Sequence, residues 1–319
     1  MSNPSKSIRD ALQAEETALR SAHRWLNRQD LIGAFLFLTS IAACIGVGTL
    51  YYQGFIPAWT CLLANAFFLS IGHEIEHDLI HRLYFSRHKW LRDSMLLLGW
   101  LTRPTSINPW IRMRLHHHHH RNSGQLDDAE ERLIGNGIPY NNLARWLVMA
   151  GPWFAFLQLR SLRRHGSPFR TLVLVLSPFP MVFGATVFVV YWLLLSLFGP
   201  GISQWAYDRM PLWNALMVGL IGPNLLRMFC LQFVSSTIHY FGDVRELRDQ
   251  TQVFNAWYWL PFQAFCFNFG ATHALHHFLP SQPFYIRQWL AQRIYPVMKT
   301  QGVRFNDIGT FRRNNRHGA

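Results

Sequence analysis

The residues with the clearest capacity for chemistry are histidines, which gather in three short clusters. The first cluster spans residues 73–81, the second is the uninterrupted run His116 to His120, and the third spans residues 273–277. One further histidine, His239, precedes the third cluster. The run of five lies inside the chain and is followed by ordinary sequence, so we interpret it as native and not as a purification tag.

The spacing within the clusters matches the periodicity of an α-helix, in which residues three and four apart share a face. The second and third clusters both have the form H-x-x-H-H, which places three imidazoles of each on one face. The histidines of the first cluster follow one another at four-residue steps, which also keeps them near one face. The sequence therefore predicts nine or ten imidazoles around one volume, from His73, His77, His81, His116, His119, His120, His239, His273, His276 and His277.

Such a set exceeds the four ligands of a single zinc ion and fits two metal ions. No cysteine accompanies the histidines, which disfavours soft-metal and iron–sulfur sites. Imidazole ligands suit Fe, Zn, Cu or Ni, and iron is the choice that adds redox chemistry with oxygen. The alternative, that these are ordinary structural histidines, would be reasonable for one cluster and is disfavoured by the repetition.

The composition indicates an integral membrane protein. Hydrophobic residues make up 50% of the chain and charged residues only 15%, which is apolar for a soluble domain of this length. Four stretches approach the ~20 residues that a membrane-spanning helix needs, at 31–55, 56–72, 171–198 and 212–234. We therefore expect an all-α integral membrane protein with four transmembrane helices and a cytoplasmic histidine-rich helical cap that holds the metal site.

The formal charge of +13 is distributed along the chain as expected for these four spans. Of the 30 Lys and Arg residues, 5 precede the first span, 14 lie between residues 72 and 171, and 9 follow residue 235. Four spans place these segments on one side, which the positive-inside rule makes cytoplasmic together with both termini. No nucleic-acid motif accompanies the charge, although a basic face could attract acidic headgroups, a phosphorylated carrier or an acidic redox partner. The four scattered cysteines form no C-x-x-C and are expected to be reduced.

We expect three parts in one chain: a cytoplasmic helix over 1–30, the membrane domain over 31–290 and a cytoplasmic tail over 291–319. Within the membrane domain, the apolar stretches 94–101 and 143–159 favour interfacial or re-entrant helices. An acidic pair, Asp127-Asp128, lies in a loop-like segment after the second cluster. It could accept hydrogen bonds from liganding imidazoles, and a solvated turn is an equal alternative.

The clusters resemble the three histidine boxes of the membrane fatty acid desaturase family, whose members hold a di-iron centre on the cytoplasmic side. The resemblance covers about residues 31–290. The family's H-D-x-x-H box is similar to residues 77–81, its H-x-x-H-H box to 116–120, and its last H-x-x-H-H box, followed by an apolar pair and proline, to 273–280. The resemblance implies a set of metal ligands: His77, His81, His116, His119, His120, His239, His273, His276 and His277.

Two features depart from the family pattern. His73 precedes the first box and is a possible further ligand, and it creates an H-E-x-x-H pattern that also resembles alkane hydroxylases and zinc proteases. A zinc protease would leave the other clusters unexplained. The second box has two surplus histidines, His117 and His118, so its ligand assignment could shift.

The resemblance implies a membrane-bound oxidoreductase with two iron ions (Fe2+) as cofactor and O2 as co-substrate, which desaturates a fatty acyl or other long aliphatic chain. No catalytic side chain is expected beyond the metal centre. A fused haem domain is absent, so electrons would come from a separate ferredoxin or cytochrome. Asp78, Glu74 and Asp243 are expected to accept hydrogen bonds from the liganding imidazoles. The expected location is the lipid bilayer of a bacterial inner membrane.

Alternative functions stay open on the same scaffold. One is a hydroxylase or other monooxygenase, and another is a 1-alkene-forming fatty acid decarboxylase. A third, from a different class, is a non-enzymatic membrane metal-binding or transport protein. Transporters place ionisable ligands in the middle of the bilayer, whereas these clusters lie at span ends or beyond, which favours an enzyme.

Overall fold

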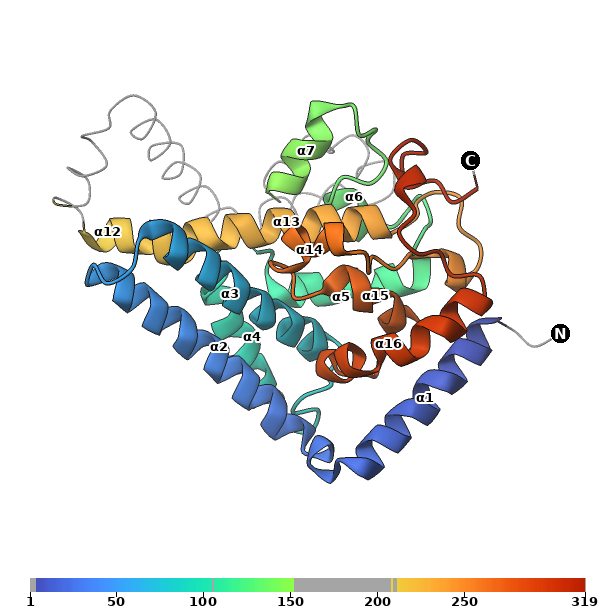
Figure 1. Ribbon diagram of the computed structural model, residues 1–319, viewed down its shortest axis with the longest axis horizontal. Coiled ribbons are helices and arrows are strands. Elements are labelled where there is room, and N and C mark those ends of the chain that lie inside the picture. Colours follow the sequence, from blue (N-terminus) through green and yellow to red (C-terminus); the bar gives the residue numbers. More distant parts are fainter. Residues whose placement is uncertain (1–3, 105, 152–207, 209–210, 319) are drawn as a thin grey trace.

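The structure, a computed structural model, describes residues 4–104, 106–151, 208 and 211–318 (Figure 1). Nearly all regular structure in this part of the chain is helical, and the β-type pairing recorded there consists of two isolated bridges, His239 with Thr251 and Val253 with Phe305. The prediction of an all-helical protein is therefore confirmed for the residues that the structure describes.

In the N-terminal third, α1 (Pro4–Ala22) and α2 (Gln29–Tyr52) form the two arms of a V, and α2 and α3 (Ala58–Ile80) form a helical hairpin (Figure 1). Helix α1 meets α2 at a short turn, and α2 pairs with α3. Pro57 immediately precedes α3, where its missing N–H costs no hydrogen bond. Several large apolar side chains of α2 are more than half exposed, as expected for a helix that faces lipid: Leu31, Phe35, Leu38 and Ile45.

Two helices in the described part of the chain are long and apolar enough to cross a membrane. They are Gln29–Tyr52 and Asn214–Ile238, which correspond to the predicted spans 31–55 and 212–234. The predicted span 171–198 lies outside the residues that the structure describes.

The remaining predicted span, 56–72, lies in α3 but is not one of these two helices. Its apolar part is short, because α3 continues directly into the polar first histidine cluster. At 1.5 Å per residue, the 15 residues from Ala58 to Gly72 reach about 22 Å, less than the ~30 Å of a hydrocarbon core.

Four shorter helices follow: α4 (Lys89–Leu101), α5 (Pro109–Asn122), α6 (Ala129–Leu133) and α7 (Leu143–Ala150). The start of α5 is well defined, because the Asn108 side chain accepts hydrogen bonds from the backbone N–H groups of Trp110 and Ile111, and proline occupies the first helical position. Helix α4 is too short to span, in agreement with the prediction for 94–101. The predicted segment 143–159 begins with α7 and continues outside the described residues. The interfacial or re-entrant placement of both segments stays a prediction.

The C-terminal half begins with α12 (Pro211–Leu216), which continues through a π-helical stretch at Met217–Ile221 into α13 (Gly222–Ile238). After an irregular aromatic segment come α14 (Leu260–Gln263), α15 (Phe269–Phe278) and α16 (Phe284–Thr300). The expected boundary after residue 290 falls inside α16. Short turns of 3₁₀-helix lie at Arg24–Asn27, Leu247–Asp249, Trp257–Trp259 and Ile308–Thr310.

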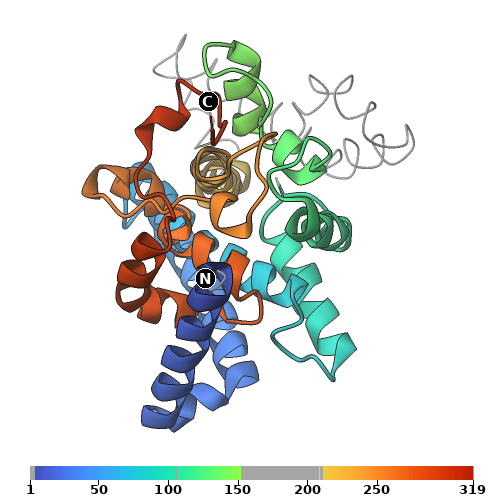
Figure 2. The ribbon, with the colours of Figure 1, turned by 90° about the vertical axis from the view of Figure 1, so that its right-hand side faces the viewer.

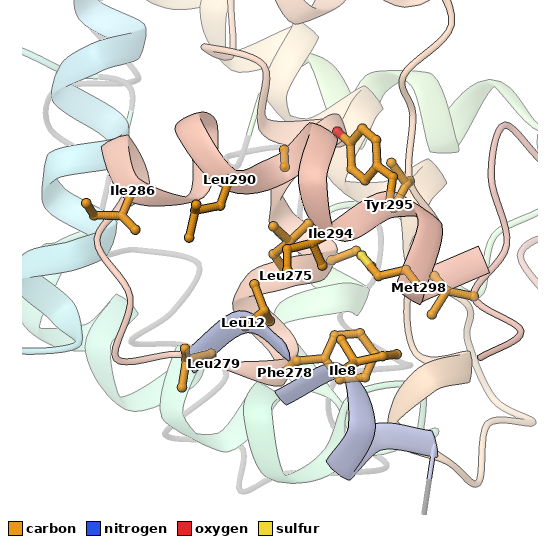
Figure 3. Packing of buried hydrophobic residues seen from close by; sticks show 14 of the residues in the cluster. Ile8, Leu12, Leu275, Phe278, Leu279, Ile286, Leu290, Ile294, Tyr295 and Met298 are labelled. Carbon is orange, nitrogen blue, oxygen red and sulfur yellow. The ribbon is translucent and has the colours of Figure 1, made fainter. Parts of the chain in front are cut away.

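Helix α15 lies between a hydrophobic core and the histidines. Figure 3 shows its Leu275 and Phe278 packed with α1 and α16, whose apolar side chains fill this core. Figure 2 looks along α13 and shows the teal helices of the first half and the red α16 on opposite sides of the molecule. A second core, which includes Ile75 and Leu79, packs the far side of α3. The two cores turn the histidine-bearing faces of α3 and α15 towards each other.

Candidate metal centre

Eight histidines form two groups of four in which one ring nitrogen of each residue lies within 4.8 Å of those of the other three. All of these rings are buried except that of His81, which is partly exposed. The first quartet is His77, His81, His116 and His276. The second quartet is His119, His239, His273 and His277.

Four segments that are distant in sequence supply the two quartets. Helix α3 contributes His77 and ends at His81, while His239 follows the last residue of α13. Helices α5 and α15 each contribute to both quartets, since one H-x-x-H-H pattern gives His116 to the first and His119 to the second. The helical spacing therefore creates the shared face, and the packing of the helices divides its histidines between two sites.

Hydrogen bonds hold the Nδ1 atoms of three rings in the second quartet. The Nδ1 atom of His119 lies 2.7 Å from Asp128 Oδ2, and that of His239 lies 2.7 Å from the Ser235 carbonyl oxygen. His277 Nδ1 lies 2.9 Å from Gln250 Oε1. Because these oxygens act as acceptors, each Nδ1 is the donor, and Nε2 is the ring atom left to bind a metal ion.

The Nε2 atoms of three rings of the second quartet converge. His277 Nε2 lies 3.2 Å from both His239 Nε2 and His273 Nε2. Two nitrogens bonded to one metal at about 2.1 Å and at right angles to each other are about 3 Å apart. The separations of these nitrogens therefore fit a metal ion held by imidazole.

The first quartet has a different set of partners. His116 Nδ1 lies 2.9 Å from Glu130 Oε2, whereas His276 Nδ1 faces Arg287 Nη1 at 3.2 Å. In the described part of the chain neither ring nitrogen of His77, nor Nε2 of His81, has a hydrogen-bond partner. Buried imidazole nitrogens without a partner are costly unless something binds them, which again fits a metal ion.

His120 lies beside the first quartet and outside the group of four. Its Nε2 atom is 2.9 Å from His276 Nε2 and 3.1 Å from His116 Nε2. The position brings a fifth nitrogen to the edge of this quartet, so nine histidines of the described residues border the two sites.

Burial sets the protonation of most of these rings. It lowers the pKa of His116, His276 and His277 well below the usual value, and neighbouring imidazoles lower it further, so these rings are neutral. His119 is different: burial lowers its pKa, but the carboxylates of Asp128, Glu130 and Glu131 together outweigh burial and raise the pKa to about 10. A metal ion at the second quartet must therefore displace a proton from His119.

Three other histidines of the clusters lie outside both quartets. Both ring nitrogens of His73, the possible additional ligand, are 3.4 Å from the guanidinium of Arg112. His118 is exposed and contacts Asn122 through Nε2 at 2.9 Å, and His117 is partly exposed. The surplus residues of the five-histidine run therefore occupy the outer face of α5.

The three carboxylates expected behind the ligands lie elsewhere. Asp78 accepts hydrogen bonds from Tyr84 Oη and the Phe284 N–H, and its Oδ1 is 3.9 Å from His77 Nδ1. Glu74 lies 3.4 Å from Arg287. Asp243 is exposed and accepts hydrogen bonds from the backbone N–H groups of residues 317 and 318.

The acceptors that do contact the rings come mainly from the segment after α5. Asp128 also accepts from the backbone N–H of Glu131, so it caps α6 while it holds His119. The neighbouring Asp127 is exposed, so Asp128 is the buried residue of the acidic pair that contacts a ring and Asp127 is solvated. Glu130 and Glu131 were not identified from the sequence, although the run of acidic residues from 127 to 131 could have indicated them. No sequence pattern indicates Gln250 or Arg287 as partners of the rings.

A cavity of about 110 Å³ opens onto both quartets. Rings of the first and second quartets form one wall, and apolar side chains such as Leu115, Leu231 and Phe269 form another. Two arginines, Arg112 and Arg227, complete the lining. A second, mainly apolar cavity of about 540 Å³ lies among α2, α3, α4 and α12, with Arg103 on its wall.

Comparison with known proteins agrees with this geometry. The family model for fatty acid desaturases matches residues 53–309, which include all nine histidines at the two sites. No curated protein gives a match. Because the family model covers most of the chain, the protein belongs to the fatty acid desaturase family.

Proposed function

We propose that this protein is a membrane-bound di-iron oxidoreductase that uses O2 and electrons from a separate donor to desaturate a fatty acyl chain. The observation that carries the proposal is the pair of histidine quartets, in each of which four ring nitrogens lie within 4.8 Å of one another. Family membership implies an oxidoreductase, and a donor set of imidazoles without thiolate suits iron.

The ligands proposed are the eight residues of the two quartets, with His120 at the edge of the first. Bound iron would supply the redox chemistry with O2 that removes hydrogen from an unactivated C–H bond. The protein's own contribution is to hold the rings: Asp128 orients His119, Glu130 orients His116, and Gln250 orients His277. Phe269 stacks on His273 with ring centroids 4.1 Å apart and shields that side from water.

The substrate and setting follow from the surroundings of the site. The apolar cavity of about 540 Å³ has the size and lining expected of a pocket for an aliphatic chain. The chain's basic segments support a topology with both termini in the cytoplasm, and the basic face suits an acidic ferredoxin or cytochrome as electron donor.

Product analysis tests the proposal. The purified protein would be reconstituted with Fe2+, a ferredoxin reducing system and O2, and given saturated fatty acids and acyl thioesters. Mass spectrometry is expected to detect a product with one internal double bond. An alcohol product would show an oxidoreductase that hydroxylates its substrate. A shortened terminal alkene would show an oxidoreductase that decarboxylates it. Absence of any oxidised product with every donor would contradict the proposal.

Two histidines of the same helix provide the matched controls. His119→Ala removes a ring of the second quartet and is expected to abolish product formation. His118→Ala removes an exposed ring of α5 and is expected to leave it within about twofold of the original protein. An equal loss of product formation in the two variants would show that the histidines of this run contribute to the helix and not to metal binding.

A further inference from the structure

A buried group of three arginines lies next to the histidine sites. Arg103 and Arg112 both form ion pairs with Glu76, the latter at 2.8 Å, and Arg112 also faces His73. Arg227, from the middle of α13, donates to Ser106 Oγ at 3.3 Å. Arg103 and Arg227 are each only 1% exposed.

This arginine group carries more positive charge than the protein neutralises. Among the described residues, Glu76 is the carboxylate in ion-pair contact with it, which leaves three cations against one anion. The two other nearby acids are engaged elsewhere, since Glu130 contacts His116 and Glu74 contacts Arg287. The residues outside the described part contain no Asp or Glu side chain that could restore the balance.

Arg227 is the member that most clearly lacks a partner. Within the described part of the chain, its Nε and Nη1 atoms are buried without a hydrogen bond. A buried, unpaired guanidinium costs several kcal/mol of desolvation, so it is retained only where something binds it. An ionisable residue inside an apolar helix of this kind usually marks a ligand pathway.

The arginine group borders both cavities. Arg112 and Arg227 line the cavity of about 110 Å³ that opens onto the quartets, and Arg103 lines the apolar cavity. An engineered cavity of about 150 Å³ holds one benzene molecule, so the smaller cavity has room for a small anionic group and a few carbons. A glycerophosphate headgroup is too large for it.

We propose that Arg227 and Arg112 bind the carboxylate of a free fatty acid in the cavity next to the two quartets. The choice of a fatty acid rests on the proposed function, and the anion site rests on the arginines themselves. A guanidinium matches a carboxylate through two parallel N–H donors, which would satisfy the unpaired atoms of Arg227. A thioester carries no charge at its acyl end and would leave them unpaired. The carbons nearest the carboxylate then lie closest to the metal site.

Binding is measured without turnover. The full-length protein in detergent, kept anaerobic, would be titrated with a saturated fatty acid, its methyl ester and inorganic phosphate, with thermal unfolding and tryptophan fluorescence as readouts. The acid is expected to bind about 10- to 100-fold more tightly than the ester, because the ester loses charged hydrogen bonds. Equal affinity for acid and ester, or equal stabilisation by phosphate alone, would overturn the proposal.

Two buried arginines separate ligand binding from a structural role. Arg227→Gln removes an unpaired cation, so we expect the ligand-free melting temperature to stay the same or rise while the preference for the acid disappears. Arg145→Gln is the control, because Arg145 donates to Ile138 O, Asn136 Oδ1, Ser236 Oγ and Asn315 Oδ1. It is expected to lower the melting temperature and to keep the preference for the acid.

The outcomes distinguish this proposal from the proposed function. A lower melting temperature for Arg227→Gln with the acid preference intact would overturn the anion site and leave the oxidoreductase standing. Tight, Arg227-dependent binding of the acid without any oxidised product from the original protein would support the anion site and refute the oxidoreductase. If Arg227→Gln fails to fold, the acid and ester titrations of the unmodified protein decide alone.

Discussion

The two histidine quartets share one type of ligand and differ in what lies behind it. Among the described residues, three rings of the second quartet have an acceptor behind them: Asp128 at His119, the Ser235 carbonyl at His239 and Gln250 at His277. The Nδ1 atom of the fourth ring, His273, has no hydrogen-bond partner there. Glu131 adds a second carboxylate, with Oε1 at 3.3 Å from His239 Nδ1.

The first quartet instead combines one carboxylate with one cation. Glu130 accepts from His116, but Arg287 points its guanidinium at His276. A carboxylate behind an imidazole makes it a stronger ligand, whereas a nearby guanidinium repels a metal cation. Two nearly identical sets of imidazole ligands can therefore differ in metal affinity because of the groups behind the rings. We expect the second quartet to bind a metal ion more tightly than the first.

The largest effect is expected at Arg287, the cation beside the first quartet. Arg287→Gln leaves Glu74 and Asp78 buried without their shared partner, so the free energy of unfolding should fall by about 3–5 kcal/mol. Removal of the cation should also narrow the affinity difference between the quartets. Denaturant unfolding and metal titration measure the two effects.

Arg293 on the same helix is the control for Arg287. It is 55% exposed and pairs with Glu15 at the surface, so Arg293→Gln should change the free energy of unfolding by less than about 0.5 kcal/mol. If Arg287→Gln were equally mild, or widened the affinity difference, the role assigned to this cation would be incorrect.

An intermediate effect is expected at the acidic pair behind α5. Asp128→Asn replaces the carboxylate that orients His119 and should weaken metal binding at the second quartet by about 10- to 100-fold. Asp127→Asn changes the exposed neighbour and should leave both affinities unchanged. Competition titrations with a metal chelator measure both variants. A loss confined to the first quartet in Asp128→Asn would reverse our assignment of partners.

The smallest effect is the release of a proton. Because the pKa of His119 is raised to about 10, this ring holds its extra proton at neutral pH, and a metal ion must displace it. The affinity of the second quartet should rise about tenfold per pH unit between pH 7 and 9, whereas the neutral rings of the first quartet give no such rise. Calorimetry in buffers of different ionisation enthalpy would detect about one proton per ion.

The same ion pair affects the stability of the metal-free protein. A raised pKa means that the contribution of the His119–Asp128 pair is fully present below the unfolded value, about 6.5, and is lost as the pH rises through about 10. Asp128→Asn should remove this pH dependence. If the stability of Asp128→Asn kept the same pH dependence, a group other than the His119–Asp128 pair would be responsible for it.

Helical periodicity was sufficient to predict the ligand faces. His273, His276 and His277 share a face because of their spacing, and α15 presents that face to the site. The division into two quartets could not be predicted, because it depends on how the distant helices pack against one another. Asp243 was expected near the metal, but the chain turns at Gly242, which has a φ of +90°, and Asp243 is exposed.

Arg227, the lone arginine of the last predicted span, is a second residue whose position could not be predicted from the sequence. The sequence presents Arg227 as one charge in an apolar stretch, and only the packing of α13 brings it to the cavity that the histidines line. Charge balance within a buried group depends on contacts between distant helices. Local sequence therefore predicts which residues a helix offers, and tertiary packing decides which of them meet.

The di-iron site is tested by the iron content of three proteins after anaerobic reconstitution: the original chain, His276→Ala and His277→Ala. We expect about two iron ions per chain in the original protein, because each quartet offers a complete set of four ligands. Each variant loses one ligand of one quartet and should retain about one ion. An original chain that held zinc in place of iron, or no more than one ion, would contradict the di-iron assignment.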